Sequence, residues 1–139
     1  MKFVFLALVV ICSSVARGDT PDISIPENDI ALIKTTDYVE VSGTNEAGGP
    51  ENFAIHNDKA IAQFVQFLTD ERYTAVPKSL KPDFKSKSFY RVRLSSKGVV
   101  VLEFQVIAES ILDLPGDASY YMQSERHSDN IMAPLLRLR

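Results

Sequence analysis

The chain has 139 residues, which suits one domain with its own hydrophobic core. Its 15 basic and 18 acidic residues give a net charge of −3, and this acidic balance argues against nucleic acid as a partner. The one cysteine, Cys12, lies in an apolar N-terminal run, so the rest of the chain has no thiol. This excludes a disulfide framework and cysteine catalysis from residue 13 onward.

The first 18 residues have the composition of a secretory signal peptide. Met1 and Lys2 supply a positive end, residues 3–12 are apolar, and residues 13–18 are mostly small. Cleavage is expected after Ala16 or Gly18, which makes the protein secreted or periplasmic and leaves no membrane span in the mature chain. The alternatives are a short retained anchor helix and a lipoprotein attached at Cys12; bulky Ile11 argues against the second.

The segment after the signal predicts an extended arm followed by two short strands. Residues 19–29 are polar and contain Pro21 and Pro26, which favours an arm. Residues 30–34 and 38–42 predict strands. Residues 43–52 contain Gly48-Gly49-Pro50 and predict a loop.

One amphipathic helix is predicted over residues 57–71. Asn57 is a good N-cap residue, and an acidic residue follows it in the first turn. Ile61, Phe64, Val65 and Leu68 are spaced so that they form one apolar stripe along a helix. This stripe requires a sheet face to pack against.

Residues 88–107 predict a β-hairpin that supplies this sheet face. Apolar and polar residues alternate along both halves, so one face of the hairpin is apolar. A three-residue loop with Gly98 in the left-handed region brings Tyr90, Val92 and Leu94 opposite Phe104, Leu102 and Val100. In that register Arg91 lies opposite Glu103. A two-residue loop on Ser96 and Lys97 would instead set an apolar face against a polar one.

The remaining segments complete an α+β prediction. Residues 74–87 predict a long exposed connection, 114–117 a turn, 118–123 a strand and 125–130 a polar loop. Residues 131–139 contain Pro134 and predict an edge strand or an irregular tail. The expected fold is a single α+β domain, 19–139, with a mostly antiparallel sheet of about four to six strands and one main helix packed on one face.

Charge is strongly segregated along the chain. Residues 19–71 carry a net charge of −9, residues 72–97 carry +7, and residues 98–139 carry −3. The basic block combines the exposed connection with the outward positions of the first hairpin strand. It predicts either a surface for an anionic partner or a solubilising loop that offsets the acidic half.

The sequence contains no motif that establishes a catalytic or metal site. His56 and His127 each precede an aspartate by two residues, but a zinc site needs three or four convergent ligands. A serine lies on each side of His127, yet no Gly-x-Ser-x-Gly motif and no glycine-rich phosphate loop occur. We therefore expect no cofactor, no metal and no catalytic residue.

The leading hypothesis is a small exported binding protein, such as an inhibitor, an immunity-type protein or an envelope adaptor. Its partner would be another protein or an anionic surface. The alternatives are a small secreted hydrolase that uses His56 or His127, and a carrier of a small apolar ligand held between helix and sheet. The predicted contact residues are Lys78, Lys81, Lys85, Lys87, Arg91 and Arg93.

Overall fold

The computed structural model describes residues 22–70, 72–83, 88–108, 110–116, 119–125 and 131–138. The predicted signal peptide and both cleavage sites lie outside these ranges. The described elements are, in chain order, β1 (Asp22–Ile23), α2 (Glu27–Ile33), β2 (Tyr38–Thr44), β3 (Pro50–Ile55), α3 (Asp58–Asp70), β4 (Tyr73–Pro77), the 3₁₀ helix η1 (Lys78–Leu80), β5 (Phe89–Ser96), β6 (Val99–Ile107), β7 (Ile111–Asp113), β8 (Tyr120–Ser124) and α4 (Ala133–Leu136).

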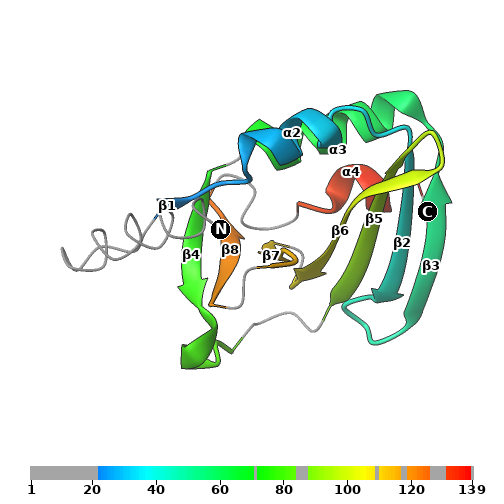
Figure 1. Ribbon diagram of the computed structural model, residues 1–139. Coiled ribbons are helices and arrows are strands. Elements are labelled where there is room, and N and C mark those ends of the chain that lie inside the picture. Colours follow the sequence, from blue (N-terminus) through cyan, green and yellow to red (C-terminus); the bar gives the residue numbers. More distant parts are fainter. Residues whose placement is uncertain are drawn as a thin grey trace.

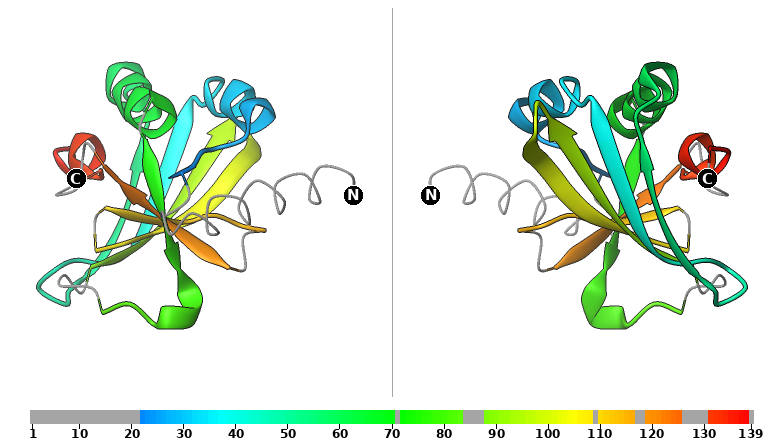
Figure 2. Two further views of the ribbon diagram at one scale, coloured as in Figure 1. Left: turned by 90° about the vertical axis from the view of Figure 1, so that its left-hand side faces the viewer. Right: turned by 90° about the vertical axis from the view of Figure 1, so that its right-hand side faces the viewer.

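The described strands form one antiparallel sheet. Its order is β1-β4-β8-β7-β6-β5-β2-β3, and α3 carries the chain from β3 at one edge to β4 near the other (Figure 1). The sheet is strongly twisted, and α2 and α3 lie over the same end of it (Figure 2). The fold is therefore α+β with an antiparallel sheet. It has eight strands in the described part of the chain, where about four to six were expected.

The extra strands come from segments that the sequence predicts as irregular. The arm 19–29 contains β1 and the start of α2, the loop 43–52 contains the start of β3, and the connection 74–87 begins with β4 and η1. No pattern in the sequence predicts β7 either. Pro50 is the first residue of β3, which is an edge strand, and these are positions where proline does not remove a ladder hydrogen bond.

The predicted strand over residues 30–34 is wrong, because residues 30–33 belong to α2 and Lys34 is its C-cap. Pro26 precedes the helix, and its carbonyl oxygen accepts a hydrogen bond from the Ile30 N–H at 3.0 Å. Glu27 and Asp29 lie in the first turn, where carboxylates stabilise the positive end of a helix. Ile33 is fully buried, so α2 contributes to the core.

The main predicted helix is confirmed as α3. The Asn57 side-chain oxygen accepts a hydrogen bond from the Ala60 N–H at 3.0 Å, as an N-cap does. The predicted stripe of Ile61, Phe64, Val65 and Leu68 is buried. Phe64 lies parallel to Phe104 of β6, with ring centroids 6.5 Å apart. The predicted packing of helix against hairpin is therefore correct.

The hairpin has the predicted strands but a different turn. Ser96 pairs with Val99, so the turn contains only Lys97 and Gly98, with φ angles of 51° and 80°. Both residues have positive φ, as a type I′ turn requires. Gly98 is in the left-handed region as predicted, but the predicted three-residue loop is wrong.

A β-bulge restores the apolar face of the hairpin. The register shifts between Leu94 and the next residue, so that Leu94 pairs with Leu102 and Val92 with Phe104. One extra residue of β6 is accommodated there, and the even-numbered residues of both strands remain on one face. The pairs lie two residues further along β6 than predicted. Val100, which was expected inside, is therefore 50% exposed.

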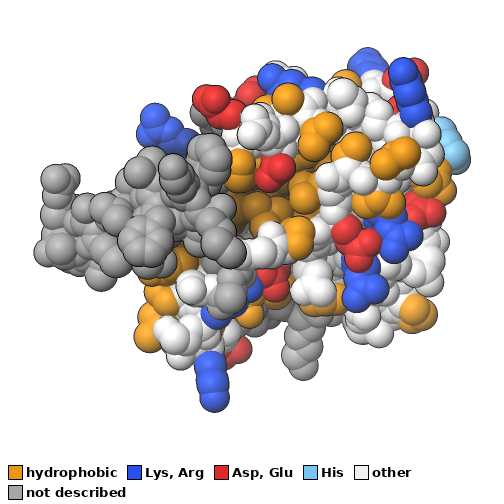
Figure 3. All heavy atoms as spheres, in the orientation of Figure 1, with side chains coloured by type: hydrophobic (Ala, Val, Ile, Leu, Met, Phe, Trp, Pro, Cys, Tyr) orange, Lys and Arg blue, Asp and Glu red, His pale blue; other side chains and the backbone are white. Residues whose placement is uncertain are grey.

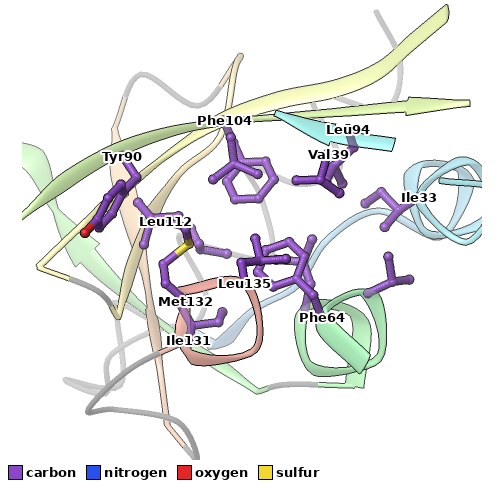
Figure 4. Packing of buried hydrophobic residues seen from close by; sticks show 14 of the residues in the cluster. Ile33, Val39, Phe64, Tyr90, Leu94, Phe104, Leu112, Ile131, Met132 and Leu135 are labelled. Carbon is purple, nitrogen blue, oxygen red and sulfur yellow. The ribbon is translucent and has the colours of Figure 1, made fainter. Parts of the chain in front are cut away.

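The C-terminal segment closes the core instead of forming an edge strand or an irregular tail. Residues 133–136 form α4, and Ile131, Met132 and Leu135 are fully buried. Leu135 lies beside Phe64 of α3 in the packed interior (Figure 4). Three helices, rather than one main helix, thus contribute to the core among the described residues.

Candidate functional site

The outward face of the sheet carries a row of charged side chains from distant parts of the chain. Because side chains alternate along a strand, Arg91 and Arg93 of β5 point away from the core. Arg93 lies directly between Glu40 of β2 and Glu103 of β6. Figure 3 shows positive and negative side chains mixed over β5 and β6. The predicted basic strand is therefore flanked by acidic partners.

Arg93 is held by both of its neighbours. Its Nε donates to Glu103 Oε2 at 2.9 Å, and its Nη1 donates to Glu40 Oε2 at 3.3 Å. The hydrogen bond to Glu103, followed by the charge of Glu103, raises the pKa of Arg93 above its ordinary value. Arg93, and not Arg91 as the predicted register required, is the residue directly opposite Glu103.

Arg91 is held more loosely. Its Nε lies 3.6 Å from Glu103 Oε1, and its side chain is 54% exposed. On one side lies a hollow of about 240 Å³ lined by Arg91, Glu103, Phe104, Gln105, Asp113, Leu114 and Pro115. On the other side lies a hollow of about 270 Å³ lined by Glu40, Val41, Ser42, Asn52, Phe53, Ala54, Arg91 and Arg93. We call these the β6–β7 hollow and the β2–β3 hollow; Arg91 borders both.

Lys78 has a structural role at the far side of the β6–β7 hollow. Its Nζ donates to Asp113 Oδ1 at 2.6 Å and lies 5.0 Å from the centre of the Tyr121 ring. These contacts join η1 to β7 and β8. Asp113 pairs with Gln105, which pairs with Arg91, so Lys78 and Asp113 extend the same charged row. The charged face, as we use the term, consists of Glu40, Lys78, Arg91, Arg93, Glu103 and Asp113.

The other predicted basic residues are not brought into this face by the described structure. Lys81 is exposed and follows η1 with a φ of 46°. Lys85 and Lys87 lie outside the described residues. Glu40 and Asp113, which sequence reasoning missed, balance two of the cations. Their outward positions follow from strand alternation, but their proximity to the cations depends on which strands are neighbours.

His56 follows the last residue of β3 and lines neither of the two hollows. It is exposed, and its ring centroid is 4.7 Å from that of Tyr38. The Tyr38 hydroxyl donates to Glu40 Oε1 at 3.3 Å. Desolvation, followed by the charge and hydrogen bond of Glu40, raises the pKa of Tyr38 above its usual value. His127, the second histidine of the hydrolase alternative, lies outside the described residues.

In the described part of the chain, no group of three or more His, Cys, Asp or Glu residues is arranged to hold a metal ion. Among the same residues, no helix has the length and apolar character needed to cross a bilayer. The chain matches no known protein family, no curated protein and no solved structure.

Proposed function

We propose that this chain is an exported binding protein that holds another protein through the charged face, with Arg91 as the central contact. The carrying observation is the position of Arg91 between two hollows, with a single long ion pair to the residues that the structure describes and more than half of its side chain exposed. As in the prediction from the sequence, the proposed partner is anionic. The proposed contact, however, is centred on Arg91 instead of on all six predicted basic residues.

The remaining hydrogen-bonding capacity of Arg91 supports a carboxylate as the group that it receives. A guanidinium has five N–H donors, and Arg91 directs one of them toward Glu103 at a long distance. A carboxylate can take two parallel hydrogen bonds from such a fork. Arg93 and Lys78 are less suited, because shorter contacts hold them to Glu103 and Asp113.

The two hollows support apolar neighbours on each side of that carboxylate. Leu114 and Pro115 contribute to the walls of the β6–β7 hollow; Phe104 also lines it, but the side chain of Phe104 is buried in the core. Ala54, which pairs with Glu40, contributes to those of the β2–β3 hollow; Val41 and Phe53 also line it, but they occupy core-facing positions of their strands. Protein interfaces gain most of their affinity from a few anchors in such pockets, with arginine among the favoured residues. The proposed partner therefore presents an Asp or Glu flanked by aliphatic or aromatic side chains.

Selection of peptides from a random displayed library on the immobilised protein tests this proposal. We expect the selected peptides to share an acidic residue beside an apolar one. Arg91→Glu should weaken their binding by about tenfold or more, because it places like charges in contact. Arg91→Lys should weaken it less, since it keeps the charge but loses the two-pronged geometry.

Lys59→Glu is the matched control, because it makes the same change of charge at an exposed position on α3, across the sheet from Arg91. Its affinity for the selected peptides should equal that of the unmodified protein. If Arg91→Glu binds as well as Lys59→Glu, the charged face is not the contact surface. Peptides without a common acidic residue would contradict the proposed partner chemistry.

A further inference from the structure

A groove runs along α3 on the helix-covered side of the sheet, away from the charged face. It has a volume of about 430 Å³ and is lined by Lys34, Thr36, Asp58, Ile61, Ala62, Val65, Gln66, Thr69 and Asp70. The lining residues that belong to α3 begin with its first residue, continue as adjacent pairs one helical turn apart and end with its last residue. They therefore form one stripe along the helix. We call this site the α3 groove. Its volume is in the usual range for small-molecule sites.

The middle of the α3 groove is mainly apolar. Ile61, Ala62 and Val65 line it there beside the exposed Gln66; Ile61 and Val65 are buried, while Ala62 is exposed. The small side chain of Ala62 leaves room above the two larger ones. An apolar body can therefore lie on this part of the helix and remove its surface from water.

One end of the groove has balanced charge. Val39 pairs with Ile55, which brings the segment between α2 and β2 next to the start of α3. Lys34 and Asp58, which both line the groove, therefore belong to this end. Their opposite charges offset each other, so this end favours neither an anion nor a cation.

The other end is negative. Asp70 is the last residue of α3, where the unpaired carbonyl groups of the helix also carry partial negative charge. No basic residue lies in the last turn of α3, and the exposed Arg72, two residues further on, does not line the groove. The ion pairs of the described residues do not include Asp70. A carboxylate at this position is unfavourable for the helix alone. A bound cation would relieve this repulsion.

We propose that the α3 groove binds a small amphiphilic cation, with its apolar body over Ala62 and Val65 and its ammonium or guanidinium group at Asp70. The groove has the matching order of features along its length: a charge-balanced end, an apolar middle and a negative end. This site and the charged face lie on opposite sides of the sheet. The proposal is therefore independent of the proposed protein contact.

Titration of the ¹⁵N-labelled protein with 2-phenylethylammonium, followed by NMR, tests this proposal. We expect saturable shifts at the amides of Ala62, Gln66, Thr69 and Asp70. The protein should bind 2-phenylethanol more weakly than the ammonium and should not bind phenylacetate, because only the ammonium is attracted by the negative end of the groove. Asp70→Asn should raise the dissociation constant for the ammonium by about threefold.

Two further variants locate the bound molecule. Ala62→Trp places a large group in the apolar middle at an exposed position, and it should abolish the shifts while the rest of the spectrum remains folded. Asp83→Asn is the matched control for Asp70→Asn. It makes the same change of charge at an exposed position after η1 that does not line the α3 groove.

Asp83→Asn should therefore leave the affinity for the ammonium unchanged. Equal binding of the ammonium, the alcohol and the carboxylate would show that charge is not recognised. An Asp70→Asn variant with unchanged affinity, or an Ala62→Trp variant that still shows the shifts, would overturn the proposed placement. So would a loss of affinity in Asp83→Asn as large as that in Asp70→Asn.

Discussion

Gly43 illustrates how one residue limits the packing of the sheet. It lies in β2 and pairs with Glu51 of β3 on one side and Tyr90 of β5 on the other. Its φ is 156°, and a Cβ added there would lie 2.0 Å from the backbone oxygen of Phe89. That oxygen belongs to a paired strand and cannot rotate away. A side chain at position 43 would therefore push β2 and β5 apart.

Gly43→Ala should destabilise the protein by about 3 kcal/mol, through backbone strain and the clash with β5. Gly48→Ala is the control, because Gly48 also has a positive φ, of 86°, but has open space around its Cβ position. Gly48→Ala should lower the free energy of unfolding by only about 1 kcal/mol. Urea unfolding of both variants measures the difference. Equal losses would mean that the close approach of the strands does not restrict position 43.

At the scale of one element, the β5–β6 hairpin shows how turn and register are linked. Its turn places Lys97 in the left-handed region with a φ of 51°, which is unfavourable for lysine. The Lys97 N–H donates to Asp37 Oδ2 at 3.0 Å, so the turn is also tied to the segment before β2. The bulge after Leu94 then returns the apolar residues to the core face. The hairpin tolerates a strained turn because its strands are paired on both sides.

Lys97→Asn should stabilise the protein by about 0.5 kcal/mol, because asparagine followed by glycine is the preferred pair for this turn. Lys97→Ala removes the same charge but is no better suited to positive φ, so it should give no gain. Thermal or urea unfolding of both variants separates turn conformation from charge. A gain in Lys97→Ala as large as in Lys97→Asn would refute the conformational explanation.

At the scale of the whole molecule, α4 completes the core that the sheet and the other helices leave open. Leu135 is fully buried and packs in the interior with Phe64 (Figure 4). Leu138, three residues further on, is 46% exposed. The stability of the fold should therefore depend on this short C-terminal helix far more than its length implies.

Leu135→Ala should reduce the free energy of unfolding by about 2 to 5 kcal/mol, since it leaves a cavity between α3, α4 and the sheet. Leu138→Ala removes the same atoms from an exposed position and should change it by less than about 0.5 kcal/mol. Denaturant unfolding measures both. Similar losses in the two variants would show that the C-terminal segment does not form part of the cooperative core.

The features that the sequence predicts correctly depend on residues close together in the chain. Asn57 and the stripe of α3 predict a capped amphipathic helix, and the alternation around Tyr90 and Phe104 predicts which face of the hairpin is buried. The periods of a helix and a strand are local, so a single segment is enough to reveal them. The predicted strand over 30–34 was wrong because a short apolar run fits either period.

The residues alone determined the buried faces of α3, β5 and β6, and the positive charge of the strand that carries Arg91 and Arg93. Only the tertiary structure decided which strands are neighbours, and hence that Glu40, 53 residues before Arg93, would hold it from the adjacent strand. Strand pairing brings together residues that no local pattern connects. For this reason Lys78, Arg91 and Arg93 of the basic block belong to a mixed charged face in the fold, with Arg91 as its most exposed cation among the ion-paired residues described.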